Sequence, residues 1–282
     1  MSKKKFISMM GMPVTEQLGS QMWHFAALSY IAHRTDHRVV FFQEHAQTGR
    51  GLRLHQNFDN LPFELISIAD LGEGDQVYSI FPLNKQVAVE SAVYQLNPGL
   101  NYDFQGLFSS YKYWWPWREQ VRAMYQFRAP VLEQARAVVE RARKPGRALV
   151  SLHVRRTDYL NGFFVNVNMD YFKAAFAQFE GQAVSYLVFS DDLPWCKEAF
   201  ADLPHVEFAE GNEAIVDMCA MSLCDHNITA NSSFSFWGAF LNANPGKRMV
   251  APARTLKSDL MIPHLNYCWL PDDFILVDAG NV

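Results

Sequence analysis

The chain has 282 residues, enough for two lobes of roughly 100–150 residues, and 49% of them are hydrophobic, so each lobe can bury a core. The formal net charge of −4, from 25 basic and 29 acidic residues, excludes an overall field that attracts nucleic acid. No window holds the roughly 18 uncharged apolar residues of a membrane span, and no signal peptide is evident, so we expect a soluble, cytoplasmic protein without a transmembrane segment.

The first residues alternate between strand and helix patterns. We predict a strand over 5–12, a loop over 13–19, a helix over 19–35 and a second strand over 37–43. This order is the beginning of an α/β unit. Between 46 and 115 the periodicity is weaker, and no elements are assigned there.

The second half of the sequence is more regular. Two helical segments, 116–127 and 130–144, come first, and Pro130 suits the first turn of the second one. Strands then alternate with helices: strands at 147–153, 184–189, 205–209, 227–230 and 248–252, and helices at 169–179, 194–200, 213–223 and 233–243. Short apolar strands separated by helices predict a parallel, doubly wound sheet that is buried on both faces. We place the domain boundary near 128–146, dividing 1–128 from 129–282.

Two arginines follow the strand that ends at His153. In doubly wound sheets ligands bind outside the carboxyl ends of the strands. Residues alternate along an extended chain, so His153 and Arg155 point to one side and Arg156 to the other. We expect Arg155 to clamp a diphosphate beside His153, and Arg156 to pair with a carboxylate of the scaffold. The alternative is a solvated start of a loop.

Two carboxylates follow the next strand, at Asp191 and Asp192. Their position before Leu193 and Pro194 suits the cap of a helix. A magnesium site is the alternative, but adjacent carboxylates point apart on an extended chain. We favour capping combined with a ligand contact.

The stretch TANSSFSFWGAF, residues 229–240, leads from a strand into an amphipathic helix. The unpaired amides of its first turn face the strand-end crevice, which is a site ready for phosphate. Capping alone explains Ser232 or Ser233 equally well. In the preceding helix Asp217 stands alone among apolar neighbours, with Ile215, Met218 and Leu223 expected in the core. Its carboxylate can accept the N1 and N2 protons of a guanine, or it is an exposed helix residue.

An aromatic cluster precedes the predicted boundary. Sugars stack on such rings, so the cluster is a candidate acceptor wall, although core packing between the lobes is the favoured reading. Its members are Tyr111, Tyr113, Trp114, Trp115 and Trp117.

These motifs, in this order, resemble the bacterial-type, GDP-fucose-dependent α-1,2-fucosyltransferases of glycosyltransferase family eleven. The resemblance lies in residues 16–28, 153–160, 186–200 and 217–241, and more loosely in 106–122. It implies a GT-B-like α/β fold of two Rossmann-like lobes, with the donor site in the cleft between them. The 1–128 lobe would bind the acceptor and the 129–282 lobe the nucleotide sugar.

The resemblance also implies roles for individual residues. Arg155 would hold the β-phosphate of GDP-fucose, and His153 would lie against the nucleotide. Asp217 would accept from guanine. The diphosphate and ribose would be surrounded by Asn231, Ser232, Ser233 and Phe234.

The first-lobe loop departs from the family pattern. The family has a glycine pair where this chain has Glu16 and Gln17, and an asparagine where it has Ser20. A close backbone approach at that pair is therefore lost. Gly19 and Gln21 match the pattern, and we expect them to contact the donor.

The implied reaction is an inverting transfer of fucose from GDP-β-L-fucose to a terminal galactose of an oligosaccharide, without a metal. Asp158 is the first candidate for the base, Glu16 the second and His24 the third; otherwise the leaving diphosphate takes the proton. The alternatives are another linkage, α-1,6 or O-fucosyl, a catalytically silent module that binds GDP-sugar, or a phosphohydrolase.

Overall fold

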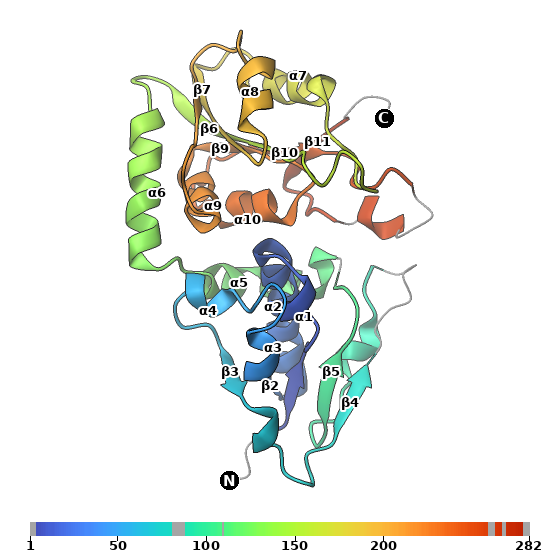
Figure 1. Cartoon of the computed structure of the whole chain (residues 1–282). Coiled ribbons are helices and arrows are strands. Elements are labelled where there is room, and N and C mark those ends of the chain that lie inside the picture. Colours follow the sequence, from blue (N-terminus) through green and yellow to red (C-terminus); the bar gives the residue numbers. More distant parts are fainter. Residues whose placement is uncertain (1–3, 81–87, 109, 259–262, 267–268, 279–282) are drawn as a thin grey trace. The chain divides into compact units, whose positions relative to one another are not determined.

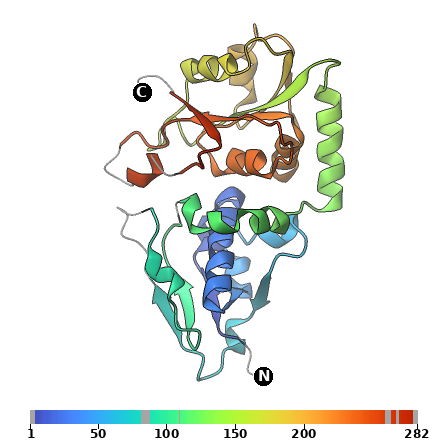
Figure 2. The ribbon, with the colours of Figure 1, turned by 180° about the vertical axis from the view of Figure 1, so that it is seen from behind.

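The computed structural model describes residues 4–80, 88–108, 110–258, 263–266 and 269–278. The chain divides into two compact units, Met1–Gln126 and Phe127–Val282, and each has its own sheet (Figures 1 and 2). The division lies two residues before the boundary predicted between 128 and 129.

The first unit contains a five-stranded sheet in the order β3-β2-β1-β5-β4, and all of its strand pairs are parallel. The strands are β1 (Phe6–Ser8), β2 (Arg38–Phe42), β3 (Phe63–Ile66), β4 (Val77–Ile80) and β5 (Asn101–Phe104). The helices are α1 (Met12–Thr15), α2 (Leu18–Thr35), α3 (Gln43–Ala46), α4 (Leu54–Asn57) and α5 (Arg118–Met124). Short 3-10 turns are η1 (Ile68–Asp70), η2 (Ser91–Tyr94), η3 (Tyr111–Tyr113) and η4 (Trp115–Trp117).

The opening of the first unit differs from the prediction in one respect. The first strand ends at Ser8, and a short helix, Met12–Thr15, lies where a loop was predicted. Pro13 sits in its first turn, where a fixed φ and a missing N–H cost nothing. The predicted helix over 19–35 is confirmed as Leu18–Thr35, and the predicted strand 37–43 as Arg38–Phe42.

The second unit contains a six-stranded parallel sheet in the order β11-β10-β9-β6-β7-β8. Its strands are β6 (Ala148–Val154), β7 (Val184–Ser190), β8 (Val206–Phe208), β9 (His226–Ile228), β10 (Met249–Pro252) and β11 (Phe274–Val277). Its helices are α6 (Ala129–Ala142), α7 (Met169–Ala177), α8 (Leu193–Ala199), α9 (Ala214–Leu223) and α10 (Ser233–Leu241), with the 3-10 turn η5 (Pro263–Asn266). The predicted doubly wound sheet is confirmed; the prediction lacked only its last strand, Phe274–Val277.

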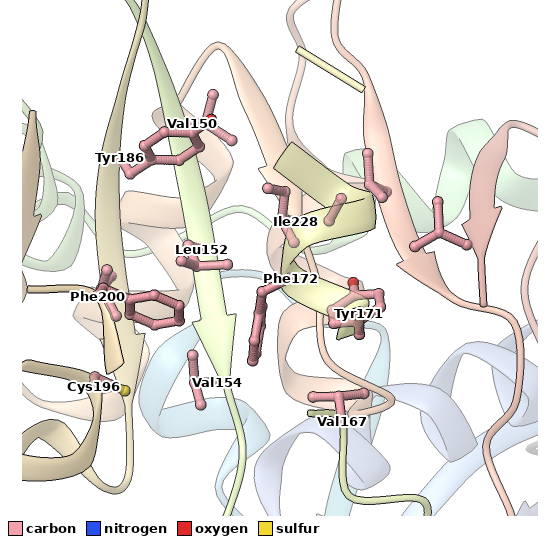
Figure 3. Packing of buried hydrophobic residues seen from close by; sticks show 14 of the residues in the cluster. Val150, Leu152, Val154, Val167, Tyr171, Phe172, Tyr186, Cys196, Phe200 and Ile228 are labelled. Carbon is pink, nitrogen blue, oxygen red and sulfur yellow. The ribbon is translucent and has the colours of Figure 1, made fainter. Parts of the chain in front are cut away.

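Helices cover both faces of this second sheet. Figure 1 shows α7 and α8 on one face and α9 and α10 on the other. Val150, Leu152 and Val154 alternate along β6 and are fully buried against Tyr171 and Phe172 of α7 (Figure 3). Each such side chain contributes about 1.5–3 kcal/mol when fully buried. Because neighbouring residues on a strand point to opposite faces, His153 is directed to the side of α10.

The strand order of the second sheet defines where a ligand binds. From β6 the chain proceeds through β7 and β8 on one side, then returns through β9 and β10 to β11 on the other. The order therefore reverses between β6 and β9, which pair directly along Val150–Leu152. In open α/β sheets this switch point, at the carboxyl ends of the two strands, is the ligand crevice. The residues that follow Val154 and Ile228 line it.

Candidate functional site

Arg155, directly after β6, holds two carboxylates. Its Nε lies 2.8 Å from Asp158 Oδ1, and its Nη1 lies 3.2 Å from Asp191 Oδ2. The Arg155 side chain is 22% exposed and that of Asp158 is 55% exposed. The guanidinium is thus held from the protein side by Asp191 while its other neighbour, Asp158, stands in solvent.

Arg156 turns toward the scaffold, as predicted. Its Nε lies 3.0 Å from Asp192 Oδ2, and its guanidinium lies over the Trp195 ring at 4.0 Å. Asp192 also caps α8, because its Oδ1 accepts a hydrogen bond from Trp195 N at 3.3 Å. The structure therefore confirms the predicted helix cap and assigns it to the second of the two aspartates.

Asp191 organises the turn that carries the arginines. Its Oδ1 accepts from Arg156 N at 2.9 Å, and its Oδ2 accepts from Thr157 N at 3.3 Å and from the Thr157 hydroxyl. Burial opposes its ionisation, but the hydrogen bonds from Thr157 and Arg156 and the charge of Arg155 prevail and lower the pKa of Asp191. Asp191 is therefore a fixed negative charge that orients Arg155.

His153 lies at the end of β6 with its ring 5.6 Å, centroid to centroid, from that of Phe234 in α10. It is 5% exposed, and its Nδ1 has no hydrogen-bond partner among the described residues. Burial first, and the charge of Arg155 second, lower the pKa of His153 to about 3. The imidazole is neutral at physiological pH and offers an unused polar atom to a ligand.

The start of α10 closes the other side of the switch point. Ser232 is its N-cap, with Oγ accepting from Phe234 N at 3.3 Å. Asn231 donates through Nδ2 to the carbonyls of Val165, at 2.6 Å, and Thr255, at 3.2 Å. Its Oδ1 is buried without a partner in the described part of the chain. As at His153, a buried polar atom here lacks a hydrogen bond, and such groups need an explanation such as a ligand.

Asp217 lies in the first turn of α9, which follows β8 and begins at the same edge of the sheet. It is half-buried, and Asn212 Nδ2 donates to its Oδ1 at 2.9 Å. Burial raises the pKa of Asp217 to about 6, against the opposing hydrogen bond from Asn212. The expectation of buried Ile215 and Met218 is confirmed, whereas Leu223 is only half-buried.

The residues of the first unit predicted to contact the donor, Gly19 and Gln21, lie in buried positions within that unit. Gln21 is fully buried; its Nε2 donates to the carbonyls of Glu16, at 3.0 Å, and Gly51, at 2.8 Å, and its Oε1 accepts from Arg53 N at 2.9 Å. Both amide hydrogens are used, so the donating part of Gln21 holds the loop. Gly19 is buried in the first turn of α2, and Glu16 is half-buried after α1.

His24 and most of the aromatic cluster belong to the core of the first unit. His24 is 3% exposed, its Nδ1 accepts from Phe108 N at 3.3 Å, and burial lowers its pKa to about 4. Tyr111, Tyr113 and Trp114 are buried, with Trp114 edge-on to Trp23 at 5.7 Å. Such burial is incompatible with an acceptor wall made of these three rings. The favoured packing between the lobes stays a prediction.

Tyr159 was not singled out from the sequence. Its hydroxyl donates to the Asn231 carbonyl at 3.1 Å, and the Arg155 guanidinium lies 5.7 Å from its ring centroid. It therefore ties the turn after β6 to the start of α10. Only its place in the DYL sequence after the arginines pointed to it.

Neither metal-ligand clusters nor membrane-spanning helices are found in the described ranges. No group of three or more His, Cys, Asp or Glu side chains there is arranged to hold a metal ion. No helix in the same residues is long and apolar enough to cross a membrane.

A doubly wound sheet with a charged switch point places the second unit among the Rossmann-type α/β proteins. Residues 80–262 match the profile described as Glycosyl transferase family 11, and the chain belongs to this family. The resemblance drawn from the sequence motifs is thereby confirmed.

Curated relatives match part of the chain. The O-antigen biosynthesis glycosyltransferase WbnK of Escherichia coli is 38% identical over 115 residues, which cover 37% of this chain and 38% of that protein. An α-1,2-colitosyltransferase of Escherichia coli is 38% identical over 109 residues, 33% of this chain and 36% of that one. Galactoside α-(1,2)-fucosyltransferase 1 of Aotus azarae is 32% identical over 145 residues, 44% and 38% of the two chains. The matches thus span less than half the length of these relatives.

Solved structures share the fold. Fucosyltransferase NodZ from Bradyrhizobium superposes with a TM-score of 0.58 at 12% identity, over 84% of this chain and 92% of that one. POFUT1 in complex with GDP-fucose gives 0.53 at 12% identity, over 85% and 94%. These similarities confirm the predicted GT-B-like α/β fold with two parallel sheets.

Proposed function

We propose that the protein is an inverting, metal-independent α-1,2-fucosyltransferase that transfers L-fucose from GDP-β-L-fucose to a terminal galactose of an oligosaccharide. The observation that carries the proposal is Arg155, a positive charge held by Asp191 at the switch point beside the start of α10. Family membership and the α-1,2-specific relatives support the linkage.

The chemistry follows from the leaving group. The acceptor oxygen attacks C1 of fucose, the bond from C1 to the β-phosphate oxygen breaks, and GDP departs with the electron pair. The diphosphate gains negative charge as the bond breaks, so fixed donors help most in the transition state. Arg155 supplies charge, and the first-turn amides after Ser232 supply oriented dipoles.

The rest of the nucleotide has candidate partners around this point. Asp217, at the start of α9, would accept the N1 and N2 protons of guanine. His153 and Phe234 would lie against the nucleotide, while Asn231, Ser232 and Ser233 surround the diphosphate and ribose. The unpartnered Nδ1 of His153 and Oδ1 of Asn231 support this assignment. Asp191 acts through Arg155, and Gly19 and Gln21 would support the first-unit loop.

The proton of the acceptor hydroxyl needs a destination. Asp158 is the favoured base, because its exposed carboxylate stands beside the guanidinium that would bind the leaving group. Glu16 is the competing base, and transfer of the proton to the departing diphosphate is the third route. A positioned carboxylate contributes about 10²–10⁴ in rate.

Two observations favour a second candidate function, a transferase with another linkage or another GDP-sugar. The structural neighbours include an α-1,6-fucosyltransferase co-crystallised with GDP and a protein in complex with GDP-fucose, and one relative is named for colitose. A fucosyltransferase of another linkage, or a transferase of another GDP-sugar, is the alternative. A silent binding module would bind GDP without transfer.

One experiment tests the proposal and its alternatives. Purified protein is incubated with GDP-fucose and lactose, with excess EDTA in one arm, and the product linkage is read by NMR. We expect an α-1,2-linked fucose on galactose in both arms. GDP release without an acceptor requirement indicates a hydrolase, and loss of transfer in EDTA refutes metal independence.

A further inference from the structure

The turn that follows Arg155 exposes two apolar side chains next to the proposed reaction centre. Leu160 is 42% exposed and Phe163 is 50% exposed. Single exposed apolar residues are ordinary, but these two lie within four positions of each other and just after Asp158. The turn is compact: Gly162 N donates to Tyr159 O at 3.3 Å, and a Cβ at Gly162 would lie 3.0 Å from Asp158 O. Phe163 therefore directly follows the point at which the chain folds back onto the backbone of Asp158.

The exposed ring is supported from beneath by other aromatic rings. The Phe163 and Phe164 centroids are 4.5 Å apart with the planes 37° apart, and Phe164 stacks on Tyr159 at 4.5 Å and 14°. The Arg155 guanidinium lies 5.7 Å from the Tyr159 centroid. A series of contacts between neighbouring side chains thus joins the proposed phosphate ligand, Arg155, to the exposed ring of Phe163.

The backbone around Phe163 is fixed by a second segment. Lys257 N donates to Phe163 O at 3.0 Å, Val165 N donates to Thr255 O at 2.9 Å, and Phe164 pairs with Leu256 in an antiparallel bridge. Lys257 Nζ adds a bond to Gly162 O at 2.9 Å. The backbone that carries this half-exposed ring is thus held by a neighbouring segment, so little conformational entropy is lost when the ring binds a ligand.

We propose that Phe163 is the stacking platform for the acceptor sugar, with Asp158 beside it receiving a hydroxyl of the same sugar. This inference rests on the proposed function. An aromatic face with an adjacent carboxylate suits a pyranose, which has an apolar C–H face and polar hydroxyls at its rim. A galactose ring presents such a face because its axial 4-hydroxyl leaves one side free of polar groups. Phe163 lies outside the aromatic cluster considered as an alternative acceptor wall, in which the rings of Tyr111, Tyr113 and Trp114 are buried.

Kinetics of Phe163 variants test the platform. Phe163→Ala is expected to raise the KM for lactose about 2- to 10-fold, the range that corresponds to about 0.5–1.5 kcal/mol for an aromatic contact. The KM for GDP-fucose stays unchanged. Phe163→Trp restores the lactose KM, whereas Phe163→Leu, which keeps apolar area without a ring, does not. Leu276→Ala, at a 53% exposed residue of β11, is the matched surface control.

The contrary results are equally definite. A lactose KM within twofold of wild type in Phe163→Ala, or a Phe163→Leu variant equal to wild type, overturns the platform. A parallel rise in the KM for GDP-fucose places Phe163 at the donor and overturns it as well. Absence of any transfer by the wild-type protein is a failure of the proposed function instead. In that case saturation-transfer NMR with lactose decides the platform: signal on the galactose ring that is lost in Phe163→Ala supports it, and no signal overturns it.

Discussion

Replacing Asp158 with asparagine should separate binding of the donor from catalysis. Asp158 Oδ1 lies 2.8 Å from Arg155 Nε, so in the free protein it occupies a guanidinium edge that a diphosphate needs. Asp158→Asn keeps the shape and removes a competing negative charge. Asp191 stays at 3.2 Å from Nη1, so Arg155 keeps its orientation. We therefore expect GDP to bind more tightly to the variant.

The expected gain in GDP affinity follows from the solvent exposure of Asp158. The Asp158 side chain is 55% exposed, so solvent screens the pair, and exposed ion pairs are worth about 0.2–1 kcal/mol. GDP affinity should thus rise by no more than about fivefold. The transfer rate should fall by about 10²–10⁴ if Asp158 is the base.

Calorimetric titration with GDP and kcat measurements with lactose provide the two readouts. Glu16→Gln is the variant for comparison, since Glu16 is a half-buried carboxylate and the competing base. A tenfold loss of GDP affinity in Asp158→Asn would show that the carboxylate supports donor binding. Full turnover in Asp158→Asn with loss in Glu16→Gln would move the base to the first unit.

Further predictions concern the proposed guanine acceptor Asp217, the packing of α10 against α9, and the turn that carries Arg155 and Arg156. Burial raises the pKa of Asp217 to about 6, and its carboxylate must be ionised to accept two guanine protons. GDP should therefore bind roughly tenfold more weakly at pH 5 than at pH 7. A Kd for GDP that does not change with pH in the wild-type protein refutes the role of Asp217 as the guanine acceptor. Gly238→Ala would set a Cβ 2.7 Å from Met221 Cβ and should cost about 1–3 kcal/mol in urea unfolding, whereas Gly246→Ala, with nothing nearer than 3.6 Å, should be close to neutral; equal stabilities contradict the packing argument. Asp191→Ala removes the acceptor of two backbone amides and the anchor of Arg155, and we expect GDP affinity to fall about tenfold while far-UV circular dichroism is retained; unchanged affinity shows that Arg155 needs no orientation from Asp191.

The sequence allowed the second unit to be predicted well because its signals are local and repeated. Each strand from β6 to β9 is short, and each is followed by polar residues and an α-helix. The last strand, Phe274–Val277, escaped because no helix pattern separates it from its neighbour and its four residues carry no periodicity. In the first unit, weak periodicity between 46 and 115 hid β3, β4 and β5.

Side-chain roles were harder to predict than elements. The alternation of side chains along an extended chain correctly predicted that Arg156 points to the scaffold. This pattern follows from the local backbone alone. The sequence could not show that Asp191 holds the turn or that Tyr159 bridges to Asn231, since these contacts span 34 to 72 residues and exist only after folding. For the same reason, the amide of Gln21 could be matched to a motif, but its burial against Gly51 and Arg53 could not be foreseen.

The role of Arg155 as the diphosphate ligand is tested most directly by comparing GDP with guanosine in the wild type and in Arg155→Gln. Guanosine lacks the phosphates, so the ratio of the two dissociation constants isolates the diphosphate contribution. We predict that Arg155→Gln lowers the ratio of the guanosine Kd to the GDP Kd by about 10- to 150-fold, because GDP binds more weakly while guanosine affinity is unchanged. This range corresponds to the loss of a charged hydrogen bond of about 1.5–3 kcal/mol. An unaltered ratio would contradict the account.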